Sequence, residues 1–289
     1  FVPSRPPDYL PEVLISSDLQ LLAASPTEVR PLVGPFAGLA ADRAVDDLLG
    51  GLVVQEPDAE GAGPGDVVWY RAEGGEPMVI DQAGAELLDV GYVGGSPAAV
   101  VLVGSDQVDR IRLVDNERTL MVTLEDEEQV LDLSASGGFH ALVLANDRCG
   151  DLRFYAADGT RIDLNGPGEP DCIVPRRPAY GAVGLSPDAG AVVYTDVSYR
   201  DDGIEIATEL VARELPSGTE YFRAKIGDDG DRITALSFDG ERVAYLRQSE
   251  TGVAVAVVDL STEAETLIPL DADIVVDSVS FARLPLARS

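Results

Sequence analysis

The chain has 289 residues, of which 45% are hydrophobic and 25% charged, enough for one large core or two smaller ones. Its 51 acidic residues outnumber 21 basic ones, which gives a formal net charge of −30. Such a surface repels the phosphate backbone of nucleic acids and the anionic face of a membrane, so neither is expected as a partner. A solvated acidic surface explains this charge more simply than specific cation binding does.

The first ten residues are expected to form a proline-rich linker, and residues 11–289 a single domain. The opening FVPSRPPDYLPE holds four prolines in twelve residues, a composition typical of a stiff spacer. The chain starts at Phe1 without a signal peptide, which suggests a processed portion of a longer product. No run of about 18–20 uncharged apolar residues occurs, so no membrane span is expected within this segment.

A repeated pattern runs along the chain, consisting of a short strand of small residues, a polar or glycine-rich turn, and a β-branched strand. The copies are LAADRAVDDLLGGLVVQ (39–55), VGYVGGSPAAVVLV (90–103), LSASGGFHALVL (133–144), LSPDAGAVVYT (185–195) and LSFDGERVAYLRQ (236–248). Equivalent positions at Val53, Val100, Leu142, Val192 and Val243 are separated by 47, 42, 50 and 51 residues. Periods of this length are typical of β-propellers with four strands per blade.

Further alternating strands lie between these copies, as in DVVWYRA with PMVID and in VAVAVVDL with AETLIPL. Only ADRAVDDLL (41–49) has a helical period, and it is expected to fall in a turn. A period near 48 residues predicts an all-β fold, a six-bladed propeller with four-stranded antiparallel blades. The expected inner strands are FAGLAA, LDVGYV, LDLSAS, GAVGLS, ITALSF and DSVSFA, which are small and apolar with few acids.

The two ends of the chain are expected to share one blade. DSVSFAR (277–283) supplies an innermost strand with no room after it for three more. The segment from residue 11 to about 36 supplies three strands without an innermost partner. Pairing them would close the ring and remove its open sheet edges.

The turns Ser-Pro-Asp (186–188) and Ser-Phe-Asp-Gly (237–240), followed by Val-Val-Tyr and Val-Ala-Tyr, resemble the WD40-like (PD40) repeats of TolB-like six-bladed propellers. Propellers of this kind occur in bacterial envelope lipoproteins and receptor ectodomains. The resemblance implies a propeller that binds proteins outside the cytoplasm, either secreted or anchored at the cell envelope. It transfers no catalytic residue to this chain.

Few residues are suited to catalysis or metal binding. His140 is the only histidine, and neighbouring Ser134 and Ser136 lack the G-x-S-x-G pattern of a nucleophile elbow, so His140 is expected to make a local hydrogen bond at a strand end. One histidine and two cysteines are too few for a zinc site, and no metal or cofactor is expected. GDDGDR (227–232), DADIVVD (271–277) and EDEE (125–128) are expected to be solvated loops, because none has EF-hand spacing. Trp69 and Tyr70 are expected in the core or on a blade flank.

Cys149 and Cys172 are predicted to form a disulfide. Cys149 lies in the loop between the second and third strands of its blade, and Cys172 lies in the connector to the next blade. These two loops leave a four-stranded blade on the same face. An even cysteine count in an acidic chain indicates an oxidising compartment.

The same face carries the longest connectors, at residues 56–66, 165–181 and 196–205, and long loops on a rigid scaffold often bind partners. Arginine and tyrosine gather there in an otherwise acidic chain, and both are enriched in interface hot spots. Neutralisation of nearby acids is an equally weighted explanation for Arg176 and Arg177. The predicted partner-binding residues are Arg176, Arg177, Tyr180, Tyr199 and Arg200.

Two functions follow from these observations. The first is a non-catalytic scaffold that contacts a protein or envelope component through this loop face. The alternative is a carboxylate-dependent, glycan-active propeller of the glycosidase or lyase type, which needs paired acids at the mouth of the channel. The small, apolar inner strands favour the first function, so no enzyme activity is expected.

Overall fold

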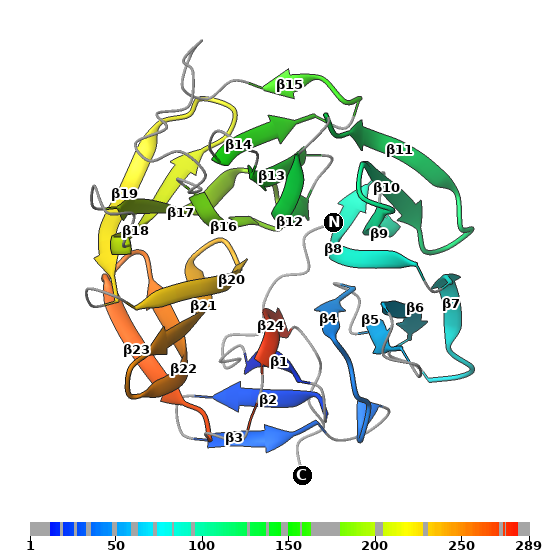
Figure 1. Cartoon of the computed structure of the whole chain (residues 1–289), viewed down its shortest axis with the longest axis horizontal. Coiled ribbons are helices and arrows are strands. Elements are labelled where there is room, and N and C mark those ends of the chain that lie inside the picture. The colour runs from blue at the N-terminus through cyan, green and yellow to red at the C-terminus, as the bar shows by residue number, and fades with distance from the viewer. Residues whose placement is uncertain are drawn as a thin grey trace.

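Six four-stranded antiparallel sheets make up the described part of the chain in a computed structural model. The structure describes residues 12–17, 20–25, 28–32, 36–47, 51–58, 63–71, 74–82, 84–93, 96–125, 128–136, 139–145, 150–156, 158–162, 180–199, 205–227, 231–271, 274 and 276–282. The predicted linker at residues 1–10 lies outside these ranges. The sheets are arranged as blades around a centre, which confirms the predicted six-bladed propeller (Figure 1).

Each blade is named here by its position in the ring, and its strands are given from the centre outward. Blade 1 contains β24 (Val276–Ala282), β1 (Glu12–Ser17), β2 (Leu22–Ser25) and β3 (Glu28–Pro31); blade 2 contains β4 (Arg43–Asp46), β5 (Leu52–Pro57), β6 (Pro64–Tyr70) and β7 (Met78–Asp81); blade 3 contains β8 (Ala85–Val93), β9 (Ser96–Val103), β10 (Gln107–Arg112) and β11 (Arg118–Thr123). Blade 4 contains β12 (Gln129–Ser136), β13 (Phe139–Ala145), β14 (Gly150–Tyr155) and β15 (Arg161–Ile162); blade 5 contains β16 (Tyr180–Leu185), β17 (Ala191–Tyr199), β18 (Glu205–Glu214) and β19 (Glu220–Ile226); blade 6 contains β20 (Arg232–Phe238), β21 (Arg242–Ser249), β22 (Gly252–Asp259) and β23 (Ala264–Pro269).

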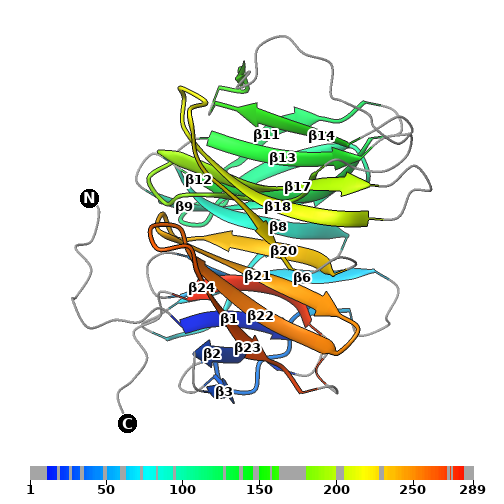
Figure 2. The same ribbon diagram turned by 90° about the vertical axis from the view of Figure 1, so that its left-hand side faces the viewer.

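Blade 1 joins the two ends of the described chain. Strand β24 pairs antiparallel with β1 from Glu12 opposite Ala282 to Ser17 opposite Val276, with an irregularity near Ser17. The blue and red strands lie side by side in both views (Figures 1 and 2). Because β24 is the innermost strand of this blade, it also borders the channel.

Adjacent blades pack through buried aliphatic side chains. Between blades 3 and 4, for example, Val100 and Val108 of blade 3 meet Leu133, Leu142 and Leu144 of blade 4. These residues alternate along their strands, so one face of each blade packs on the blade before it and the other on the blade after it. The ring therefore has a core at every seam between blades.

The turn at Asp239-Gly240 forms as its sequence predicts. Gly240 has a φ of 101°, and the carboxylate of Asp239 accepts hydrogen bonds from the amides of Glu241 at 2.9 Å and Arg242 at 2.7 Å. An aspartate that caps its own turn in this way replaces ladder bonds that the chain loses on reversing direction. The turn is structural.

The inner strand of blade 2 differs from the prediction. It is formed by Arg43–Asp46 from within ADRAVDDLL, and not by FAGLAA. Phe36 instead begins a turn and is buried against Leu14 and Leu21 of blade 1. A strand of four residues has only two positions on each face, too few to show a period of two, and this is why the segment looked like a turn with a helical period.

Candidate functional site

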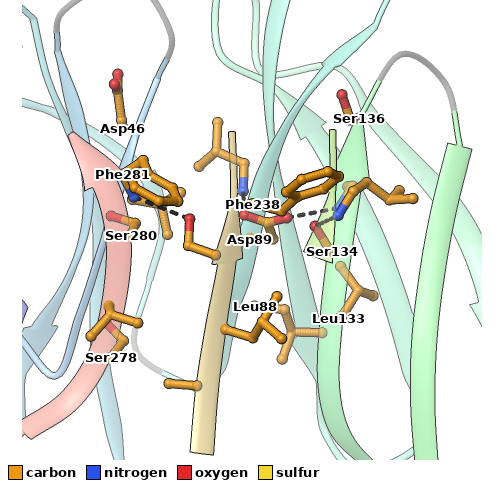
Figure 3. A pocket seen from close by; sticks show the side chains of 18 of the residues that line it. Asp46, Leu88, Asp89, Leu133, Ser134, Ser136, Phe238, Ser278, Ser280 and Phe281 are labelled. Atoms are coloured by element: carbon orange, nitrogen blue, oxygen red, sulfur yellow. Dashed lines mark hydrogen bonds between the residues drawn. The ribbon is translucent and has the colours of Figure 1, made fainter. Parts of the chain in front are cut away.

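The innermost strands of all six blades surround a polar cavity of about 110 Å³ (Figure 3). Four aspartates, five serines and one arginine line it, together with apolar residues that include Phe238 and Phe281. The acids are more numerous here than the sequence analysis anticipated. The question for function is whether these carboxylates are available to a ligand or a substrate.

The edge of an inner strand explains why polar side chains are needed at this place. Each inner strand pairs with its own blade on one side only, so its other edge leaves backbone N–H and C=O groups without ladder partners. Such groups are costly to bury unsatisfied. Side chains from the preceding blade reach these groups at five of the six junctions between described inner strands.

Two of these contacts between inner strands are made by aspartates at equivalent positions in successive repeats. The carboxylate of Asp89 in β8 accepts the amide of Ala135 in β12 at 2.7 Å and that of its own neighbour Val90 at 2.7 Å. The carboxylate of Asp132 in β12 accepts the amide of Val183 in β16 at 2.8 Å and that of Leu133 at 2.9 Å. Figure 3 shows Asp89 pointing across the gap toward the next inner strand.

Serine and arginine side chains make the remaining hydrogen bonds between adjacent inner strands. Ser134 accepts the amide of Leu185 at 3.0 Å, and Ser237 accepts the amide of Phe281 at 3.1 Å. Ser280 donates to the carbonyl of Ala44 at 3.4 Å, and Arg43 donates to the carbonyl of Leu88.

Blades 5 and 6 instead approach closely at Gly184. A Cβ on this glycine would lie 2.6 Å from Cδ2 of Leu236 and 3.0 Å from Cβ of Phe238. The missing side chain therefore allows a contact where the other junctions have a hydrogen bond.

Burial shapes the electrostatics of the two aspartates. It raises the pKa of Asp89 from 3.8 to about 6, against the hydrogen bonds from Ala135 and Val90 and the charge of Arg43. Burial also raises the pKa of Asp132 to about 6, and the nearby charge of Asp89 adds to this, while Arg43 opposes it. A raised carboxyl pKa is common in active sites, but buried structural networks produce it as well.

The engagement of both carboxylates by backbone amides favours the structural explanation. A retaining or inverting glycosidase needs one carboxyl group free to protonate the leaving group and a second free to attack or to activate water. Asp89 and Asp132 each accept one amide from the next blade and one from the following residue of their own strand, so both oxygens of each carboxylate are engaged. The two aspartates of the channel therefore stabilise the ring by linking adjacent blades.

His140 does not form a nucleophile–base pair with a serine. Ser134 accepts the amide of Leu185, and the hydroxyl of Ser136 has no hydrogen-bond partner among the described residues. His140 lies in β13, 3% exposed, on the blade face that packs against blade 3. The expected local hydrogen bond is absent at Nε2, which has no hydrogen-bond partner among the described residues.

Of the five predicted partner-binding residues, only Tyr180 has a described side chain. It is half-buried, and its ring meets that of Tyr194 edge-on at a centroid distance of 5.6 Å. Tyr199 ends β17, at the same end of blade 5 as Tyr180. Arg176, Arg177 and Arg200 lie outside the described ranges, as do Cys149 and Cys172.

The structure also tests expectations for residues outside the channel. Trp69 is buried, as expected, and its indole N–H donates to Asp47 at 2.7 Å. Glu128 is not solvated as expected, because it is buried and pairs with Arg153. Asp231 of GDDGDR was also expected to be solvated, but it is buried and forms an ion pair with Arg247 at 2.6 Å. No group of metal-ligating side chains occurs in the described part of the chain. Ser186 bonds to Asp188 within its own turn at 2.7 Å.

Arg43, Asp89 and Asp132 were not predicted from the sequence as residues of the channel. A signal for the two aspartates was present, since LDVG and LDLS place an acid at the same position of two successive repeats. A recurrent acid on a strand of small residues indicates a buried role. No signal marked Arg43, because its strand was itself not recognised.

Comparisons with known proteins support the fold. TolB from Acinetobacter baumannii superimposes with a TM-score of 0.62 at 12% identity, covering 97% of this chain and 69% of that protein. The tricorn protease superimposes with a TM-score of 0.52 at 12% identity, covering 93% of this chain but only 33% of the protease. No family model and no curated protein matches the sequence.

The chain thus has a TolB-like propeller fold. At 12% identity the likeness concerns the architecture alone, and the same architecture occurs within a protease. The described residues include no helix long and apolar enough to cross a membrane.

Proposed function

We propose that this chain is a non-catalytic binding propeller that acts outside the cytoplasm and contacts a protein or a cell-envelope component. The observation that supports this most is the engagement of Asp89 and Asp132, two of the four aspartates that line the channel, by amides of adjacent inner strands. Nε2 of His140 and the hydroxyl of Ser136 have no hydrogen-bond partner among the described residues, which points the same way. The TolB-like fold is compatible with this role.

The contact surface in this proposal is the entry face, defined as the face at which the inner strands begin. Tyr180 begins β16 and Tyr199 ends β17, so both lie at the entry face of blade 5. We place the partner-binding arginines Arg176, Arg177 and Arg200 in the loops of the same face. A positively charged group within a chain at −30 would select a partner with acidic or hydrogen-bond-accepting groups.

Replacing Arg176 and Arg177 with alanine should weaken partner binding about 30-fold, the loss typical of truncating a hot spot worth about 2 kcal/mol. The partner would first be isolated with the intact chain as bait, and the affinity then measured by calorimetry. The matched control is Arg112→Ala with Arg118→Ala, which removes the same charge from half-exposed positions next to a turn on the opposite face. Equal losses in both double variants would mean that net charge matters and the entry face does not.

The predicted disulfide between Cys149 and Cys172 belongs to the same proposal. Closing a loop of about 24 residues should stabilise the chain by about 3 kcal/mol through the entropy of the unfolded state. Protein produced in an oxidising compartment should be lighter by two hydrogen atoms in intact mass, because the compartment's oxidant takes up two protons and two electrons, and it should resist alkylation until it is reduced. Ready alkylation of both thiols without reductant would disprove the bond and remove the argument for an oxidising compartment.

A further inference from the structure

The seam between blades 3 and 4 contains a pair of basic side chains that the channel does not use. Strand pairing places Asp89, Val100 and Arg110 at one level of blade 3. It places Ala135 and His140 at one level of blade 4. The hydrogen bond from the amide of Ala135 to Asp89 brings the two levels opposite each other. Arg110 and His140 therefore face each other across the seam.

Alternation of side chains agrees with this placement. Val100 and Val108 on one side of blade 3 pack against blade 4, and Arg110 follows Val108 by two residues in β10. Leu142 and Leu144 pack against blade 3, and His140 precedes Leu142 by two residues in β13. Burial, with the charge of Arg110 as a second cause, lowers the pKa of the His140 imidazole to about 4.

Both side chains have an unsatisfied nitrogen in this seam. Nη1 of Arg110 and Nε2 of His140 are buried, and neither has a hydrogen-bond partner in the described part of the structure. No ion pair joins Arg110 to a described carboxylate, although Arg112 and Arg118 on the same blade each have two. A buried guanidinium nitrogen without a hydrogen-bond partner is costly in free energy.

We propose that this seam binds a small monovalent anion, for which chloride is the probe, between Nη1 of Arg110 and Nε2 of His140. The guanidinium supplies a permanent positive charge and a donor, and the imidazole supplies a second donor when its proton is on Nε2. Both nitrogens are shielded from solvent, so a monatomic ion suits the site. A bound anion would link two blades outside the channel and stabilise the ring by mass action.

A buried water molecule is the competing occupant, and it requires a different state of the histidine. Water would accept a hydrogen bond from Arg110 and donate one to an unprotonated Nε2, whereas an anion requires an N–H at Nε2. In the described part of the chain, the other charged or titratable groups near the seam are Arg112 and Glu117, which act on Arg110, and Arg161 and Tyr155 of blade 4, which occupy the level of His140. The protonation state of Nε2 therefore separates the two occupants.

The test uses the fact that His140 is the only histidine, so its imidazole ¹⁵N signals need no further assignment. Chloride would be titrated at pH 7.5 against gluconate at constant ionic strength. We expect a protonated Nε2, a saturable shift of its signal with chloride, and a rise of about 2 °C or more in the thermal midpoint. Arg110→Gln should abolish both chloride effects. Arg118 pairs with Asp81 of blade 2, away from the seam with blade 4. The variant Arg118→Gln should therefore retain both chloride effects.

An unprotonated Nε2 that does not respond to chloride would show that water occupies the seam and would overturn the proposal. A chloride response that persists in Arg110→Gln would place the anion elsewhere and would also overturn it. Bromide-soaked crystals of the unaltered chain give an independent result if Arg110→Gln does not fold. An anomalous peak between Arg110 and His140 is expected, and its absence contradicts the site.

Discussion

Deleting the last twelve residues, 278–289, should abolish the cooperative unfolding of the ring or lower its thermal midpoint by about 10 °C or more. The deletion removes most of β24, the inner strand of blade 1. Val279 and Phe281 are each only 6% exposed and pack against Val13 and Ile15 of the same blade and Leu246 of blade 6. Each such side chain contributes about 1.5–3 kcal/mol by burial, against about 5–15 kcal/mol for a whole domain.

The same deletion breaks two junctions of the channel. Ser237 loses the amide of Phe281, and Ala44 loses the hydroxyl of Ser280. Unfolding would be followed by near-ultraviolet circular dichroism. A shorter deletion of residues 283–289 keeps β24 and is the control, which should unfold like the intact chain. Identical melting of the twelve-residue deletion would show that the ring does not depend on joining its ends.

Asp132→Asn should become about 2 kcal/mol more stable, relative to the unaltered chain, when the pH is raised from 4.5 to 7.5. The pKa of Asp132 is about 6 in the folded protein and 3.8 in its ordinary state. The folded state therefore binds the proton more tightly. The stability that this provides is fully present below pH 3.8 and is lost as the pH rises through about 6. Asparagine has no charge to bury, so the variant does not incur this loss.

The free energy of unfolding would be measured in urea at both pH values. Asp188→Asn is a matched control, because hydrogen bonds to Ser186 and Gly190 hold the pKa of Asp188 below 3.8. That carboxyl group is ionised in both states across the range, so its variant should differ from the unaltered chain equally at pH 4.5 and 7.5. If the difference in unfolding free energy between Asp132→Asn and the unaltered chain were also the same at both pH values, folding would not raise the pKa of Asp132.

His140 acts in the opposite direction but does not disturb this comparison. Burial lowers its folded pKa to about 4, below the ordinary 6.5. Its contribution is therefore present above pH 6.5 and is lost as the pH falls toward 4. All three proteins retain His140, so this loss cancels in the differences between them.

The spacing of turn-and-strand repeats was sufficient to predict the number of blades. Each blade repeats one solution to the same packing problem, so Val53, Val100, Leu142, Val192 and Val243 all occupy the buried second strand of a blade. Buried β-branched and aliphatic residues at a fixed period are visible in a single sequence. The inner strand of blade 2 was not visible, because a strand of four residues beginning with Arg43 shows neither alternation nor an apolar run.

The channel was harder to predict than the blades. Whether Asp89 and Asp132 are solvated, catalytic or structural depends on which backbone amides lie opposite them, and those amides belong to strands 46 and 51 residues further on. The placement of Arg110 opposite His140 likewise depends on the register of strands in two blades. The sequence shows the residue types, and only the three-dimensional arrangement shows what they contact.

The most direct test of the central claim compares the affinity of the isolated partner for three proteins. These are the unaltered chain, the double variant Arg176→Ala with Arg177→Ala, and the double variant Asp89→Asn with Asp132→Asn, measured at a temperature where all three are folded. The account predicts that the arginine variant loses about 30-fold in affinity and that the channel variant binds like the unaltered chain. Retained binding by the arginine variant together with lost binding by the channel variant would place recognition in the channel and contradict the account.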